Sequence, residues 1–185
     1  MGTRSLIAVQ LDGEYKIAQY SQWDGYPEGQ GLGCLNFLKT YMVEYKFQAM
    51  LRNLKIISTY DQLKAIRSLY EEDTYFPEFD RDTGSKILEI VQDGKTTSGC
   101  VVNNVGFAGD ADCFGCEYAW VIDLDKRTFE AYVGYNKIPL TQEDRFYWLD
   151  KSDEEYHPVR KVAEWSLSNL PTKDEFLNAF TEDEE

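Results

Sequence analysis

The sequence predicts one α+β domain over residues 1–185, with a mainly antiparallel sheet built from hairpins and three to five helices packed on it. Two segments, 4–20 and 117–135, have the pattern of β-hairpins, and the segments of helical periodicity lie between and after them. Grouped strands and helices are typical of α+β domains, whereas strict alternation is typical of parallel α/β folds. The chain has 185 residues, 43% of them hydrophobic, which is enough for a sizeable core.

The first hairpin is indicated by Asp12-Gly13, which lies between the apolar-rich runs 4–11 and 14–20. Glycine readily adopts the positive φ that a type I′ turn requires, so this dipeptide is a strong turn signal. An unbroken pairing from a two-residue loop would place Arg4 opposite Ser21. The segment that follows the second strand should therefore emerge beside the N-terminus.

Four segments have helical patterns. Apolar residues between Gly33 and Leu54 form two stripes that are offset from each other, which predicts a bent helix or two helices. A Thr-x-x-Gln capping box at Thr59 predicts the start of a further helix. A short helix at 83–94, closed by a glycine, and a C-terminal helix at 170–180, opened by a second capping box, complete the set.

The second hairpin, 117–135, is indicated by alternation of apolar and polar residues on both of its arms. The segment 100–108 is a possible strand, and 157–167 has the pattern of a last strand. His157, the only histidine, starts that last segment and is expected to be exposed, because a lone histidine has many ordinary uses. A catalytic triad or nucleophile elbow is not indicated.

The segment 19–31, "QYSQWDGYPEGQG", is the strongest functional signal in the chain. Proline fixes φ, and glycines at 25, 29 and 31 are expected to allow backbone conformations that other residues resist. These residues suit a tight turn between a strand and a helix, and Trp23 could simply cap the core. An Arg4–Asp24 pair could likewise hold the terminus in place.

The functional hypothesis for this corner is a cleft with aromatic walls and convergent polar groups, which is the usual composition of a small-ligand site. Hairpin register is expected to bring its members together beside the N-terminus. The candidate binding residues are Arg4, Gln22, Trp23, Asp24, Tyr26, Gly29 and Gly31. The leading prediction is therefore a cytoplasmic protein that binds a ligand or a protein partner at the Gln22–Gly31 corner, with no catalytic residue assigned.

Two other readings of this region are kept open. In N-terminal-nucleophile hydrolases, residue 2 opens the first strand and attacks the substrate, but Gly2 has no nucleophilic side chain and Thr3 would need further trimming. The "GQGLG" run at 29–33 resembles a phosphate-cradling loop at a helix start. It lacks the lysine of a P-loop, and Asp24 and Glu28 nearby would repel phosphate.

The charge balance is strongly acidic, with 33 acidic and 19 basic residues and a net charge of −14. Direct binding of nucleic acid or of an anionic membrane is not expected, because phosphate attraction needs a basic patch. A well-solvated surface is the simplest interpretation. The alternative is an acidic inhibitor or nucleic-acid mimic, and the acidic tail 181–185 is expected to be flexible.

The cysteines do not complete a metal-site pattern. "CFGC" at 113–116 has the spacing of half a zinc site or of a redox pair, but no second Cys-x-x-Cys follows. No apolar run is long enough to span a membrane, and the N-terminus lacks the apolar core of a signal peptide. Reduced, metal-free Cys113 and Cys116, no cofactor and a cytoplasmic location are expected.

Taken together, "MGTRSLIAV", "DGEYKIAQYSQWDGYPEGQG" and "LNFL" resemble the start of an uncharacterised protein family of bacteria, bacteriophages and some fungi. "CEYAWVIDLDKRTFEAYVGYNK" and "HPVRKVAEWSL" resemble its second half. The resemblance covers most of the chain and implies a cytoplasmic protein, in one view of mobile-element origin. Its signature is concentrated at residues 1–5 and 22–31. It implies no activity, and Cys113 is peculiar to this chain.

Overall fold

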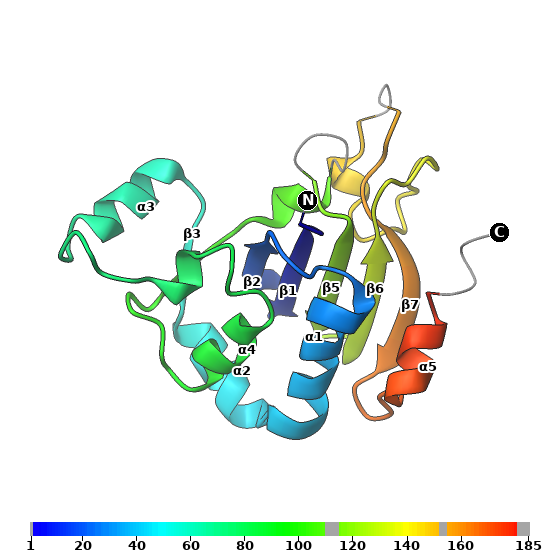
Figure 1. Ribbon diagram of the computed structural model, residues 1–185, viewed down its shortest axis with the longest axis horizontal. Coiled ribbons are helices and arrows are strands. Elements are labelled where there is room, and N and C mark those ends of the chain that lie inside the picture. Colours follow the sequence, from blue (N-terminus) through cyan, green and yellow to red (C-terminus); the bar gives the residue numbers. More distant parts are fainter. Residues whose placement is uncertain (1, 110–114, 152–154, 181–185) are drawn as a thin grey trace.

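Five strands form the central sheet, in the order β2-β1-β5-β6-β7 (Figure 1). The structure, a computed structural model, describes residues 2–109, 115–151 and 155–180. The strands are β1 (Ser5–Leu11), β2 (Glu14–Ser21), β5 (Tyr118–Asp123), β6 (Thr128–Val133) and β7 (Arg160–Ser166). Short strands β3 (Lys55–Ile57) and β4 (Cys100–Val102) form a separate parallel pair. The fold class is therefore α+β with a mainly antiparallel sheet, as predicted.

Both predicted hairpins form, and they meet side by side. β1 pairs antiparallel with β2, and β5 pairs antiparallel with β6. The two hairpins join through β1 and β5, which run parallel, with Ser5 beside Tyr118 and Gln10 beside Asp123. Strands that lie over 100 residues apart in sequence thus form the centre of the sheet. This parallel pairing was not predicted.

The register of the first hairpin corrects the prediction by one residue. Asp12 and Gly13 have φ values of 56° and 76°, as a type I′ turn requires. A bulge between Val9 and Gln10 leaves one extra residue in β2, so that Ser5, and not Arg4, lies opposite Ser21. A shift of one residue turns every side chain beyond it to the other face of the sheet.

The predicted helical region after the corner consists of two helical segments. A π-helical turn (Pro27–Gly31) leads into α1 (Leu32–Asn36) and a second π-turn (Phe37–Tyr41), and α2 (Glu44–Asn53) follows after a break. Capping boxes start α3 (Tyr60–Arg67) and α5 (Lys173–Asn178), as predicted. The short helix α4 (Lys86–Gln92) is followed by Gly94 with a φ of 66°. The predicted strand 100–108 is only β4, followed by a 3₁₀ turn.

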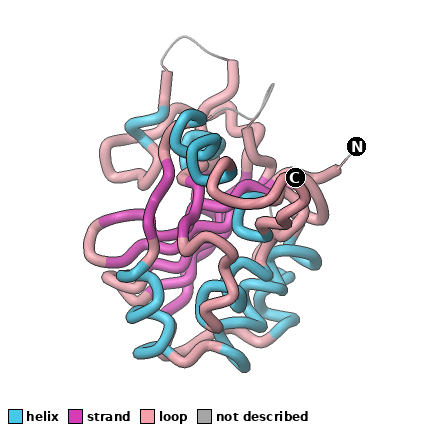
Figure 2. Tube along the Cα trace, turned by 90° about the vertical axis from the view of Figure 1, so that its left-hand side faces the viewer, coloured by secondary structure: helices cyan, strands magenta, loops and turns pink. Residues whose placement is uncertain are grey.

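The sheet has a hydrophobic core on each face. Figure 2 shows the path of the strands, helices and loops that enclose these cores. On one face, Ile7, Trp120 and Phe129 pack against α1, α2, α4 and α5. On the other face, Leu6 and Val121 pack under loops rather than under long helices. The helix α3 contributes no buried residue and lies away from the sheet, at the left of Figure 1. It therefore projects from the rest of the domain and takes no part in either core.

His157 is buried, with 6% of its surface exposed, and this corrects the expectation of an exposed histidine. Its Nδ1 lies 2.7 Å from Oδ1 of Asp150, and its backbone N–H donates to the carbonyl of Asn136. The strand β7 begins three residues later, at Arg160. The histidine therefore ties two loops together ahead of the strand.

Candidate functional site

The corner, residues 22–31, is held by backbone hydrogen bonds on both sides. The Gly25 N–H donates to the Thr3 carbonyl at 2.9 Å, which fixes the corner to the N-terminal segment. The Gln22 N–H donates to the Arg81 carbonyl at 3.0 Å, which fixes it to the turn that follows Phe79. The corner thus lies beside the N-terminus, as predicted. It also lies beside the turn at 80–82, which the sequence pattern did not indicate as a neighbour.

The glycines of the corner serve close packing. A Cβ at Gly25 would lie 2.7 Å from the Thr3 carbonyl oxygen, and a Cβ at Gly31 would lie 2.8 Å from the Trp120 ring. A Cβ at Gly29 would overlap a backbone oxygen. None of these glycines has a positive φ; Asp24, with a φ of 55°, takes the left-handed conformation instead. The expectation that the glycines supply unusual backbone conformations was wrong.

The N–H groups at 29–31 do not point outward as a phosphate cradle requires. Those of Gly29 and Gly31 both donate to the Tyr26 carbonyl, at 3.0 and 3.4 Å, and that of Gln30 donates to the Asp24 carbonyl at 2.8 Å. A phosphate would have to displace these internal bonds, because it needs free donors. The geometry therefore does not favour a phosphate loop at "GQGLG".

Polar and aromatic side chains are presented on the surface of the corner. Trp23 is 48% exposed, and its indole N–H donates to Oδ1 of Asp82 at 3.0 Å. Tyr26 is 38% exposed and donates its hydroxyl to Oδ1 of Asp24 at 3.2 Å. The nearby Asp24 carboxylate raises the pKa of the Tyr26 phenol, because it repels the phenolate. Gln22 accepts a bond from the Tyr20 hydroxyl at 2.8 Å.

Arg4 faces a different set of partners from the one expected. Its Nε lies 3.4 Å from Oε1 of Glu117, and its Nη2 donates to the Tyr135 hydroxyl at 3.2 Å. The bulge in the first hairpin explains this, because it places Ser5 on the face of Ser21 and turns Arg4 to the opposite face. Asp24 therefore contacts Tyr26, and Arg4 contacts Glu117, in place of the Arg4–Asp24 pair considered from the sequence.

Tyr135 and Glu117 were missed by the reasoning from sequence. Tyr135 is 49% exposed and has a φ of 52°, which is rare for a bulky residue. Of the four non-glycine residues with positive φ in the described chain, Asp12 and Arg127 lie in hairpin turns, whereas Asp24 and Tyr135 lie near the start of β1. Glu117 lies in the "CEYAW" segment of the family resemblance, which was the available signal.

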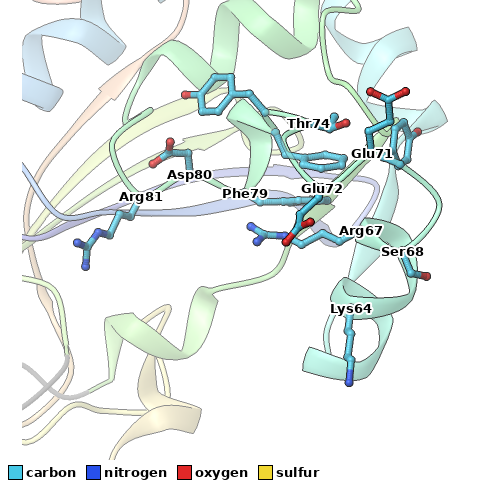
Figure 3. Close-up of a pocket in the computed structure, with 12 residues that line it drawn as sticks. Lys64, Arg67, Ser68, Glu71, Glu72, Thr74, Phe79, Asp80 and Arg81 are labelled. Atoms are coloured by element: carbon cyan, nitrogen blue, oxygen red, sulfur yellow. The ribbon is translucent and has the colours of Figure 1, made fainter.

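A second feature, the α3 cleft, is a hollow of about 770 Å³ between α3 and the segment 74–81 (Figure 3). Its lining includes Arg67 and Lys64 from α3, and Phe79 and Arg81 from the opposite side. Gln19 donates to the Asp80 carbonyl at 2.8 Å, so this side of the cleft is fastened to β2. The corner and the cleft therefore share the 80–82 turn.

A third feature, the Arg145 cluster, is a buried set of charges on the loop-covered side of the sheet. Arg145 donates to Asp123 at 2.5 Å and to both oxygens of Glu130, at 2.6 and 2.8 Å. Tyr132 donates its hydroxyl to Glu130 as well. The polar groups of this cluster largely satisfy one another, so they fasten the loop that carries Arg145 onto the sheet.

Metal ligands do not gather in the described part of the chain, where no group of three or more His, Cys, Asp or Glu side chains is placed to hold an ion. Cys34, Cys100 and Cys116 are free and buried, while Cys113 and the tail 181–185 lie outside the described residues. Within the same residues, no helix has the length and apolar character needed to cross a bilayer.

Comparisons with models of protein families, with curated proteins and with solved structures found no match to this chain.

Proposed function

We propose that this protein is a cytoplasmic binding protein whose recognition surface is the corner, residues 22–31, beside the N-terminus. The observation that carries the proposal is the exposure of the Trp23 ring. The ring is held by a 3.0 Å hydrogen bond to Asp82, yet nearly half of its surface is exposed. A tryptophan needed only to cap the core would be buried, whereas a fixed and exposed tryptophan is typical of binding surfaces.

Backbone strain next to Trp23 supports the same conclusion. Asp24 adopts the left-handed conformation, which costs about 1 kcal/mol or more for a residue other than glycine. Internal hydrogen bonds hold it there, and the strained residue presents its carboxylate beside Tyr26. Such strain is commonly found where a surface is organised in advance for a ligand. Free Cys34, Cys100 and Cys116 are compatible with the reducing cytoplasm.

The hydrolase alternative receives less support from the packing around residue 2. A Cβ at Gly2 would overlap the Gln22 carbonyl oxygen and the Trp23 ring. A nucleophilic side chain therefore has no room at residue 2 in this arrangement of the corner.

The proposal is tested with a metabolite library and purified peptide pools, with thermal melting as the readout. The variant is Trp23→Ala, and the matched control is Trp148→Ala, which removes a tryptophan that is 59% exposed at a different place. A compound that raises the melting temperature of the wild type and of Trp148→Ala, but not of Trp23→Ala, is the expected result. Equal responses of the two variants to every compound would place the binding surface elsewhere.

A further inference from the structure

The α3 cleft carries an inference that is independent of the function proposed for the corner. We infer that it binds a small molecule in which an oxyanion, carboxylate or phosphate, is attached to a planar aromatic body. Its volume of about 770 Å³ lies within the range of small-molecule sites. The cleft opens to solvent between α3 and the segment 74–81 (Figure 3).

The floor of the cleft is aromatic. Phe76 and Phe79 stack with ring centres 5.3 Å apart and an angle of 20° between their planes. Tyr70 meets Phe76 edge-on at 5.1 Å. Phe79 is only partly buried, so part of its ring is available to a ligand. A planar body placed there would extend an existing stack, which is the arrangement that aromatic rings favour.

The oxyanion is assigned from the cations of the cleft. The Arg67 guanidinium lies over the Phe76 ring, 5.9 Å from its centre, which is within the range of a cation–π contact. Within the described chain, Arg67 and Lys64 have no ion-pair partner. Arg81, at the other end of the cleft, is 66% exposed and lies 4.0 Å from Asp82. Guanidinium groups with free N–H donors form bidentate hydrogen bonds to carboxylates and phosphates.

The acidic residues of the cleft limit the ligand to a small negative charge. Oδ1 of Asp80 already accepts the Asp82 N–H at 2.9 Å, so this carboxylate is engaged in its own turn. Glu71 and Glu72 are exposed in the connection after α3 and are not held by any ion pair among the described residues. They would repel a highly charged anion but tolerate one oxyanion at the guanidiniums. Glu72, which lines the cleft together with Arg67 (Figure 3), is the acid chosen for the test below.

The side of the cleft opposite α3 is held in place without a ligand. Glu78, which is fully buried behind the floor, accepts bonds from the Thr97 and Ser98 N–H groups at 3.1 and 2.8 Å. The opposite end is fastened by the bonds from Gln19 to Asp80 and from Gln22 to Arg81. Because the floor is already ordered, ligand binding would cost little conformational entropy there, and this favours affinity.

The test uses isothermal titration of the whole protein with 3-phenylpropionate and phenyl phosphate. Benzyl alcohol controls for the ring alone, and inorganic phosphate for the anion alone. At least one aromatic oxyanion is expected to bind with a Kd of about 1 mM, and both controls more weakly by about tenfold or more. Binding by only one of the two probes identifies the carboxylate or the phosphate as the natural group.

Variants locate the binding. Arg67→Gln is expected to weaken the better probe by about tenfold or more, because it removes a charge-assisted bond. Lys86→Gln is the matched control and should change the Kd by less than about twofold, because it removes an exposed lysine of α4 with no ion-pair partner among the described residues. Arg81→Gln is the second variant if Arg67→Gln does not fold. Glu72→Gln should strengthen binding.

The inference is overturned if neither aromatic oxyanion binds at about 10 mM, or if Arg67→Gln and Arg81→Gln both bind like the wild type. It is also overturned if Glu72→Gln weakens binding, because the ligand would then present a cation. Failure at the cleft is told apart from failure at the corner because these titrations read the cleft alone, whereas the compound screen on Trp23→Ala and Trp148→Ala reads the corner.

Discussion

Replacing Arg145 by methionine tests the role assigned to the Arg145 cluster. The side chains of Asp123 and Glu130 are 0% and 2% exposed, and Arg145 is 8% exposed. Methionine retains much of the apolar volume but leaves two buried carboxylates without their cation. Breaking a buried ion pair costs about 3–5 kcal/mol. At about 2–4 °C per kcal/mol for a chain of this size, the melting temperature should fall by about 10 °C.

The assay is urea unfolding followed by circular dichroism, with Arg127→Met as the matched control. Arg127 also pairs with a glutamate, Glu44, but is 52% exposed, and the loss should be below about 1 kcal/mol. Adding Glu130→Gln to Arg145→Met should recover part of the stability, because it removes one of the stranded charges. A loss below about 1 kcal/mol in Arg145→Met would refute the reasoning.

The pH dependence gives an independent check. Burial raises the pKa of Glu130, but hydrogen bonds from Arg145, Tyr132 and Thr128 outweigh it, so the pKa lies below the ordinary value. A depressed carboxyl pKa contributes stability above the unfolded pKa of about 4.3 and loses it as the pH falls further. The difference in unfolding free energy between wild type and Arg145→Met should therefore be largest at neutral pH and shrink in acid.

Three further predictions concern packing and thiols. Gly29→Ala should destabilise the fold by about 2 kcal/mol or more, since its Cβ would overlap a backbone oxygen, whereas Gly106→Ala, with open space around its Cβ, should cost less than about 1 kcal/mol in the same urea assay. Ser5→Ala should preserve or slightly raise the melting temperature, because the Ser5 hydroxyl is buried without a hydrogen-bond partner among the described residues; a loss above about 2 kcal/mol would show a hidden partner. Burial raises the pKa of the Cys34 and Cys116 thiols, so a thiol reagent should modify them only at the rate of unfolding, and rapid modification of either in the native protein would contradict their burial.

Local sequence patterns were sufficient for the elements themselves. Asp12-Gly13 predicted the first hairpin turn, and Thr59 and Thr172 predicted two helix starts, because turn and capping chemistry depends on residues that are neighbours in the chain. The α+β class followed from their grouping along the sequence. The position of the corner beside the N-terminus also followed, since hairpin pairing alone brings the two together.

What surrounds the corner was decided by the tertiary structure. One extra residue in β2 turned Arg4 away from the face of Ser21, and the parallel pairing of β1 with β5 brought Glu117 to it instead. The contact between Trp23 and Asp82 and the α3 cleft depend on a turn about 60 residues away. Contacts of this range are selected by how whole faces pack, and no local pattern of residues specifies them.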